Sequence, residues 1–223
     1  MHSIKIITTS DGSHSLLNEE LNETYHSVHG AIQESAHVFI KNGLDYFVHQ
    51  FKAESISILE VGFGTGLNAL LTIHHTLKTA RPIKYVALEA FPFEEDVWSA
   101  LNYTDTIGLK EYFLNLHRCS WETEQTILPS FQLLKLHTTL QHVELKPKSF
   151  DLIYFDAFAP NKQAELWTFP MLQKVSEAMK MDAVFVTYCA KGQLKRDLKT
   201  LGLVTETLPG PPGKKEMVRA IKI

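Results

Sequence analysis

Three glycines follow the acidic residue Glu60 within six positions: Gly62, Gly64 and Gly66. Glycine has no Cβ, so the backbone can turn sharply and come close to a ligand, and a helix that begins after the turn offers free N–H groups. Dinucleotide-binding turns read G-x-G-x-x-G, but here Leu67 lies where the last glycine would fall, and the Gly-Lys-Ser/Thr of a P-loop is absent. The spacing therefore predicts a ligand-binding turn that is neither a dinucleotide-binding turn nor a P-loop. The alternative is a tight turn that binds no ligand.

Two more carboxylates follow apolar segments of the chain. Glu89 follows residues 83–88, and Asp156 follows residues 150–155. In an open α/β sheet the ligand lies outside the carboxyl ends of the strands, where Glu89 could accept hydrogen bonds from both ribose hydroxyls and Asp156 could lie beside a cofactor. NAD enzymes bind ribose in the same way, so Glu89 indicates a nucleoside without naming it. A structural carboxylate at a strand end or a loop cap is the alternative for each.

Two aromatic residues close to Asp156 in the sequence are candidates for substrate binding. Phe158 and Trp167 could stack on a planar group. Packing in the core would explain either residue equally well.

These residues need elements that bring them together. Apolar segments typical of buried strands cover residues 56–61, 83–88, 131–136, 150–155 and 183–188, and they alternate with predicted helices at 67–78, 94–102, 170–180 and 193–201. Such alternation predicts an α/β fold with a mostly parallel sheet covered on both faces. Two last strands, 203–208 and 217–223, are joined by a connection too short for a helix, so they should form an antiparallel hairpin. This is the outline of a class I, Rossmann-like methyltransferase.

The first fifty residues have a different character. They are polar and rich in histidine, with an Asp-Gly turn at Asp11–Gly12 and helical spacing of apolar residues over 30–41. No linker divides the chain. We therefore expect one domain, residues 1–223, with an N-terminal elaboration at 1–50 and the Rossmann-like core at 51–223.

Composition excludes several classes of protein. Among 223 residues, 44% are apolar and 21% are charged, which suits a folded core and not a disordered chain. No apolar run is long enough to span a membrane, and the N-terminus lacks the pattern of a secretory signal. Cys119 and Cys189 stand too far apart for a ligand cluster, and H-E-x-x-H is absent, so we expect no metal and a cytoplasmic location.

Charge is distributed unevenly along the chain. Residues 1–60 hold three Lys/Arg and eight Asp/Glu, a net charge of −5, whereas residues 184–223 hold eight Lys/Arg and three Asp/Glu, a net charge of +5. A basic C-terminal region is compatible with a surface that contacts phosphates. An ordinary solvated helix and hairpin would look the same.

Longer motifs make the interpretation specific. The G-x-G-x-G turn after Glu60 resembles that of S-adenosylmethionine (SAM) enzymes, in which Glu60 would face the methionine end of the cofactor. The segment Phe155-Asp156-Ala157-Phe158-Ala159-Pro160-Asn161-Lys162, followed by Trp167, resembles the F-D-A/G-F-A-P-x-K…W signature of the MnmC/MnmD methyltransferases, which act on the aminomethyl group of wobble uridine in tRNA. The similarity extends to residues 11–15, 23–31, 34–39, 187–192 and 208–217 and so covers nearly the whole chain.

The resemblance implies a reaction and a set of residues. An aminomethyl nitrogen of 5-aminomethyl-(2-thio)uridine would attack the SAM methyl group, with Asp156 binding and orienting the amine and, as a hypothesis, accepting its proton. Tyr25 and His26 would cover the site from the N-terminal element. The basic residues expected to follow the phosphates of the tRNA anticodon region are Lys191, Lys195, Arg196, Lys214 and Lys215.

Two departures from the family pattern matter. Residues 137–140 lack the acidic residue that relatives place near the adenine, so a hydroxyl or backbone groups would have to substitute. The chain also ends at Ile223 without an FAD oxidase half, so we expect a stand-alone methyltransferase, with a separate FAD-dependent oxidase or another enzyme supplying the aminomethyl group.

Other functions remain open at this point. The chain could methylate a different amine or a small molecule. An NAD-dependent oxidoreductase and a catalytically silent RNA-binding module are two further alternatives, from other classes of protein.

Overall fold

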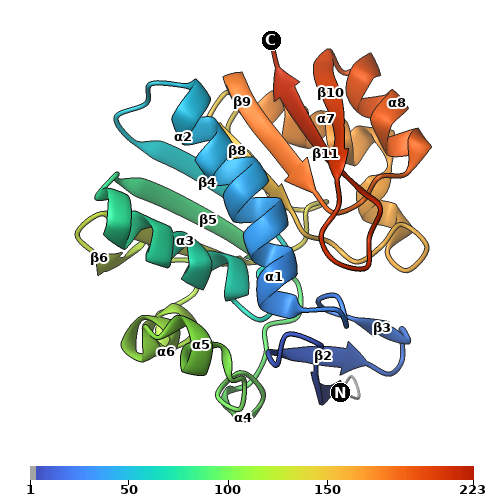
Figure 1. Ribbon diagram of the computed structural model, residues 1–223. Coiled ribbons are helices and arrows are strands. Elements are labelled where there is room, and N and C mark those ends of the chain that lie inside the picture. Colours follow the sequence, from blue (N-terminus) through green and yellow to red (C-terminus); the bar gives the residue numbers. More distant parts are fainter. Residues whose placement is uncertain (1–3) are drawn as a thin grey trace.

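A computed structural model describes residues 4–223. One large twisted sheet lies at the centre of the described structure (Figure 1). Its strand order is β10-β11-β9-β8-β4-β5-β7-β6, with β9, β8, β4, β5 and β7 parallel to one another. The strands span β4 (Ile56–Val61), β5 (Ile83–Glu89), β6 (Gln125–Leu128), β7 (Phe131–His137), β8 (Phe150–Phe155), β9 (Met179–Thr187), β10 (Leu203–Pro209) and β11 (Glu216–Lys222). The predicted α/β class and parallel core are confirmed.

The C-terminal hairpin also forms as predicted. Strands β10 and β11 are antiparallel, with Leu208 opposite Met217, and β11 continues antiparallel onto β9. The other edge strand, β6, lies antiparallel to β7 and was not predicted.

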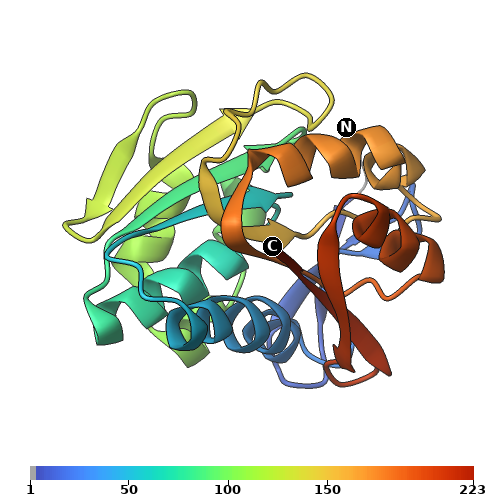
Figure 2. The same ribbon diagram turned by 90° about the horizontal axis from the view of Figure 1, so that it is seen from above.

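Helices cover both faces of the sheet and bury a separate core on each (Figure 2). Helix α3 (Leu67–Thr79) covers one face together with a long N-terminal helix. Helices α7 (Phe169–Ala178) and α8 (Gly192–Thr200) cover the other. Alternate residues of β4 divide between the two, since Ile58 belongs to the first core and Leu59 to the second.

Two predicted helices differ from the observed ones at their ends. The helix expected over 170–180 ends at Ala178, because Met179 is fully buried and pairs with Phe150 as the first residue of β9. The helix expected over 94–102 is the short α4 (Glu95–Trp98), and it is followed by α5 (Tyr103–Ile107) and α6 (Lys110–Arg118), which pack beside α3.

The N-terminal residues form two structures. Strands β1 (Ile4–Thr8), β2 (His14–Asn18) and β3 (Glu23–Thr24) make a small antiparallel sheet, and the predicted Asp11–Gly12 turn lies between its first two strands. The chain then forms one continuous helix from α1 (Ala31–Ser35) through the π-helical η1 (Ala36–Asp45) to α2 (Tyr46–Gln50). This helix packs on the main sheet, whereas the small sheet lies at the end of the molecule where the parallel strands end (Figure 1).

No helix among residues 4–223 is both long and apolar enough to cross a membrane.

The packing of α3 onto the sheet can be tested with a matched pair of leucines. Leu70 is fully buried, whereas 44% of Leu77 in the same helix is exposed. Leu70→Ala leaves a cavity and should lower the free energy of unfolding by about 2–5 kcal/mol. Leu77→Ala should change it by less than about 0.5 kcal/mol. Urea denaturation measures both, and equal losses would contradict this packing.

Candidate functional site

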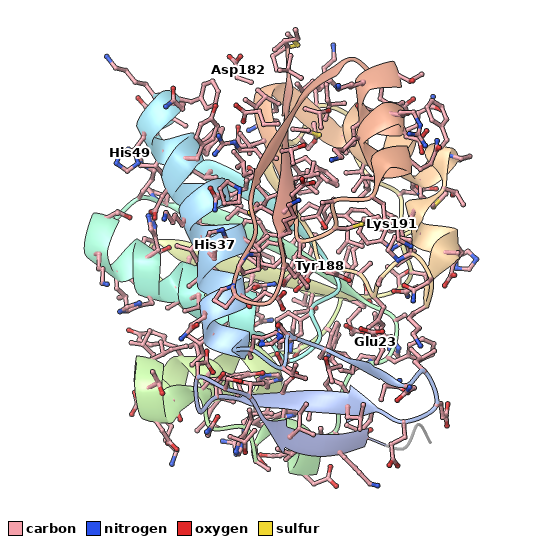
Figure 3. The ribbon with its side chains drawn as sticks, turned by 45° about the vertical axis from the view of Figure 1, so that its right-hand side comes forward. Glu23, His37, His49, Asp182, Tyr188 and Lys191 are labelled. Carbon is pink, nitrogen blue, oxygen red and sulfur yellow. The ribbon has the colours of Figure 1, made fainter. Side chains whose placement is uncertain are left out.

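The carboxyl ends of the parallel strands meet at one edge of the sheet and surround a cavity of about 450 Å³. The loops that follow β9, β8, β4, β5 and β7 succeed one another along this edge in the order of the strands. The small N-terminal sheet closes the opposite side: Glu23 and Tyr188 both line the cavity, and Figure 3 places them on elements that face each other. Residues from both ends of the chain therefore enclose one site.

The turn after β4 is held against two neighbouring loops. The N–H groups of Gly62 and Phe63 both donate to the carbonyl of Leu88. Gly62 has a positive φ of 96°, and a Cβ there would lie 2.6 Å from the carbonyl oxygen of Asp156, so no other residue fits this close approach. Gly62 and Gly64 line the cavity, whereas Gly66 is the residue immediately before α3 and does not line it.

Glu89 lies at the end of β5, where the sequence placed it, and lines the cavity. Its Oε2 accepts the Gly64 N–H at 2.8 Å and its Oε1 accepts the Phe91 N–H at 2.9 Å. Burial raises the pKa of Glu89, although these backbone donors oppose the shift. The two bonds fix the carboxylate at the rim, and each oxygen keeps a lone pair for a ligand.

Glu60 differs from its predicted role. Its side chain is fully buried on the α3 face of the sheet and does not line the cavity, because residues of a strand alternate between faces. It binds Asn68 in the first turn of α3: one Nδ2 group donates to Glu60 Oε1 at 2.9 Å and to Asp156 Oδ2 at 2.8 Å. Burial raises the pKa of Glu60 well above its usual range, against the opposing hydrogen bond from Asn68.

Asp156 lines the cavity directly above Asn68, at the end of β8. Burial and the nearby negative charge of Glu34 raise the pKa of Asp156 to about 7, against the opposing hydrogen bond from Asn68. A carboxylate that titrates near neutral pH can hold a cation or take up a proton, which are the two roles predicted for it.

The N-terminal element supplies the wall opposite Asp156. The Tyr25 ring packs edge-on against Phe158 with the ring centroids 4.7 Å apart, and both residues line the cavity. His26 Nε2 lies 2.8 Å from Thr65 Oγ1 in the glycine-rich turn, and burial lowers the pKa of His26 to about 4. The imidazole is thus neutral and joins the N-terminal sheet to the turn.

Trp167 and Lys214 lie elsewhere than expected, whereas Lys191 and Lys215 lie on the outer surface, where a residue that contacts phosphates should be. Trp167 is buried in the core against Phe155, donates its Nε1–H to the carbonyl of Phe158 at 2.8 Å and does not line the cavity, because its indole fills the space behind the Asp156 loop. Lys191 and Lys215 are exposed outside the cavity. Lys214, expected on the outer surface, points inward and pairs with Glu34.

The sequence did not single out Gln141 or Glu34. Gln141 follows β7 and lines the cavity together with Thr138 and Thr139, where the sequence lacks the expected acidic residue. Its buried Oε1 has no hydrogen-bond partner among the described residues. A buried acceptor without a partner costs free energy, which a hydrogen bond from a ligand would offset. For Glu34 the sequence signal was its place in segment 34–39, one of the segments that resemble the MnmC/MnmD methyltransferases.

The walls of the cavity are acidic. Among the described residues, five carboxylates line it and Lys214 is the only Lys or Arg that does so; the acids are Glu23, Glu34, Glu89, Asp156 and Glu165. No group of three His, Cys, Asp or Glu in this part of the chain is placed to hold a metal. The cavity is therefore suited to ligands that carry positive charge.

Comparisons with known proteins agree with this geometry. Residues 109–223 match the sequence model of a family described as S-adenosyl-L-methionine-dependent methyltransferase. Proteins named "tRNA 5-methylaminomethyl-2-thiouridine biosynthesis bifunctional protein MnmC" from Leptospira interrogans and Burkholderia multivorans are each 29% identical over 91% of this chain. The chain spans about a third of their length, 33% in both cases.

A solved structure confirms the fold. MNMC2 from Aquifex aeolicus superimposes with a TM-score of 0.80 at 24% identity, over 99% of this chain and 70% of its own. The resemblance found in the motifs is confirmed by the 29% identity of the MnmC relatives over 91% of this chain.

The raised pKa of Asp156 predicts how stability depends on pH. The folded state holds this proton up to about pH 7, whereas an ordinary aspartate releases it near pH 3.8, so the folded protein should lose stability as pH rises between these values. Asp156→Asn removes this titrating group, so the free energy of unfolding should fall less steeply between pH 4 and pH 8. Urea denaturation at a series of pH values measures this.

Asp182→Asn is the control, because it removes an exposed carboxylate at the far end of β9 (Figure 3). A decline of equal steepness in Asp156→Asn and wild type would contradict the burial of the Asp156 charge.

Proposed function

The chain belongs to the S-adenosyl-L-methionine-dependent methyltransferases, and from this premise we propose that it methylates the primary amine of 5-aminomethyl-(2-thio)uridine at the wobble position of tRNA. Family membership makes it an enzyme that uses SAM and excludes the NAD-dependent oxidoreductase. The substrate is inferred from the names of the bifunctional relatives and from an acidic cavity with a titratable Asp156.

The residues present fit the cofactor along the edge of the sheet. Asp156, Gly62 and Gly64, Glu89 and Gln141 follow β8, β4, β5 and β7, which are successive neighbours. We assign the methionine end to the glycine-rich turn, the ribose hydroxyls to Glu89 and the adenine to the unpartnered amide of Gln141. An amide offers both a donor and an acceptor, as adenine requires, so it can replace the missing acidic residue.

Asp156 prepares the amine. When bound, SAM supplies a methyl group on a positively charged sulfur, and its transfer makes a nitrogen–carbon bond as the carbon–sulfur bond breaks. An alkylammonium group has a pKa of ~10 and must lose a proton before its nitrogen can attack. The pKa of Asp156, about 7, is roughly three units below that of the ammonium, whereas the pKa of an ordinary carboxyl group is roughly six units below it. Asp156 therefore orients the ammonium and accepts its proton before transfer.

The outer surface would receive the tRNA. We assign the exposed Lys191 and Lys215 to phosphates beside the entering nucleotide. Because tRNA is modified in the cytoplasm, the reaction would take place there. An FAD-dependent oxidase or another enzyme activity would supply the free aminomethyl group.

The adenine assignment predicts a change in cofactor affinity. Gln141→Leu keeps the side-chain volume but removes both polar groups, so SAM affinity should fall about tenfold, as for one lost hydrogen-bonded pair. Thr139→Val, at the same loop, is the control and should change affinity less. Calorimetric titration with SAM measures both, and unchanged affinity in Gln141→Leu would place the adenine elsewhere.

The central experiment is single-turnover transfer from bound SAM to tRNA that carries 5-aminomethyl-2-thiouridine. Wild-type protein should convert this nucleoside to its methylamino form, as followed by mass analysis. Asp156→Asn should reduce the rate about 10²–10⁴-fold, the usual contribution of a general base, with SAM affinity retained. Unchanged rates would contradict both roles of Asp156.

The substrate is tested by the same assay. Transfer to a small primary amine but not to the tRNA would identify an enzyme acting on another amine. Binding of the tRNA without transfer would identify a silent RNA-binding module.

A further inference from the structure

A lysine ammonium is seated inside the acidic cavity. Lys214 Nζ lies 2.5 Å from Glu34 Oε1 and 3.7 Å from the centroid of the Tyr188 ring. The carboxylate neutralises the ammonium and the ring presents the negative face of its π-system to it. Together they make a site that binds a primary alkylammonium group.

Both walls of this site are fixed by other bonds. Only 4% of Glu34 is exposed, and its second oxygen accepts the Ser27 N–H at 2.7 Å. The Tyr188 hydroxyl donates to the carbonyl of Ala157 at 2.8 Å, which holds the ring beside the Asp156 loop. Since neither contact involves Lys214, the two walls do not need the lysine to keep their places.

The site lies next to Asp156, on the side away from the predicted nucleoside position. Tyr188 follows β9, which is the neighbour of β8 on the side opposite β4. The charges of Glu34 and Lys214 both act on the Asp156 carboxyl group. An ammonium bound between Glu34 and Tyr188 would therefore have Asp156 within electrostatic reach.

We propose that Glu34 and Tyr188 form the subsite for the primary ammonium group of the substrate, and that the Lys214 side chain occupies this subsite until the substrate displaces it. This inference rests on the proposed function, because it names the residues that receive the amine. Lys214 carries the same chemical group as the aminomethyl substrate. Two ammonium groups against one carboxylate would repel each other, so the lysine must leave when the substrate amine arrives.

The hairpin loop is built so that Lys214 enters from outside. Gly213 precedes it with a positive φ of 83°, and a Cβ there would lie 1.9 Å from the His29 ring. The loop thus passes directly over the N-terminal element, and only the Lys214 side chain reaches inward. A rotation of this long side chain empties the subsite without moving either wall.

The subsite can be tested without tRNA. Ethylammonium is titrated into protein saturated with S-adenosylhomocysteine and followed by NMR. Lys214→Ala should bind it about tenfold or more tightly than wild type does, because one hydrogen-bonded charge competitor has been removed. Lys199→Ala removes an exposed lysine of α8 outside the cavity and should behave like wild type, and ethanol should not bind to any of them. Equal ethylammonium affinity in wild type and Lys214→Ala would overturn the proposal.

The walls are tested in the Lys214→Ala background. Glu34→Gln keeps an acceptor for the Ser27 N–H but loses the charge, and it should abolish the gain in affinity. Tyr188→Phe keeps the ring face and should retain most of the gain, whereas Tyr188→Leu should lose it. Circular dichroism and SAM binding establish that each variant is folded. Retained binding after Glu34→Gln would overturn the role of Glu34.

Failure of this inference and failure of the proposed function are distinguishable. Ethylammonium binding by Lys214→Ala without methyl transfer to aminomethyl-tRNA by wild type would uphold the subsite and reject the tRNA substrate. Normal transfer by wild type without any ethylammonium binding would uphold the function and reject the subsite.

Discussion

The site depends on one amide group that holds two carboxyl groups, the buried Glu60 and the half-buried Asp156. Removing a carboxyl group from water costs free energy unless hydrogen bonds replace those it had with water. The Asn68 Nδ2 group donates one such hydrogen bond to Glu60 and one to Asp156, because both strand ends reach the first turn of α3. Asn68 can take this position only because the turn before it approaches the Asp156 backbone so closely. The position of the reactive carboxyl group therefore follows from backbone packing beneath the cavity.

Charge is divided between the inside and the outside of the molecule. The cavity is acidic, although the proposed substrate belongs to a polyanion, so phosphates are repelled from the interior while an aminomethyl group is attracted. Exposed lysines such as Lys191 lie outside this acidic surface. This arrangement favours entry of the aminomethyl group of one nucleotide and keeps the rest of the tRNA at the protein surface.

Local sequence patterns predicted the sheet, the hairpin and the residues at the strand ends, because strand periodicity and glycine spacing are local properties. The side-chain positions that were not predicted depend on packing between residues distant in the sequence. Glu60 and Trp167 looked like ligand contacts, but the first points toward α3 and the second fills the core behind the Asp156 loop. Lys214 lies in a basic segment, which is typical of a surface. Its side chain points inward because it forms an ion pair with Glu34, a residue distant in the sequence. Gln141 was missed because an unpartnered amide can be recognised only in three dimensions.

Glu34 and Lys214 are 180 positions apart in the sequence. A chain emerging from the ribosome can therefore form its parallel strands, β4, β5, β7, β8 and β9, and the glycine-rich turn before this contact exists. The last wall of the cavity assembles only when the C-terminal hairpin has been translated and folded back. We therefore expect a newly made chain to complete its cavity only late in folding.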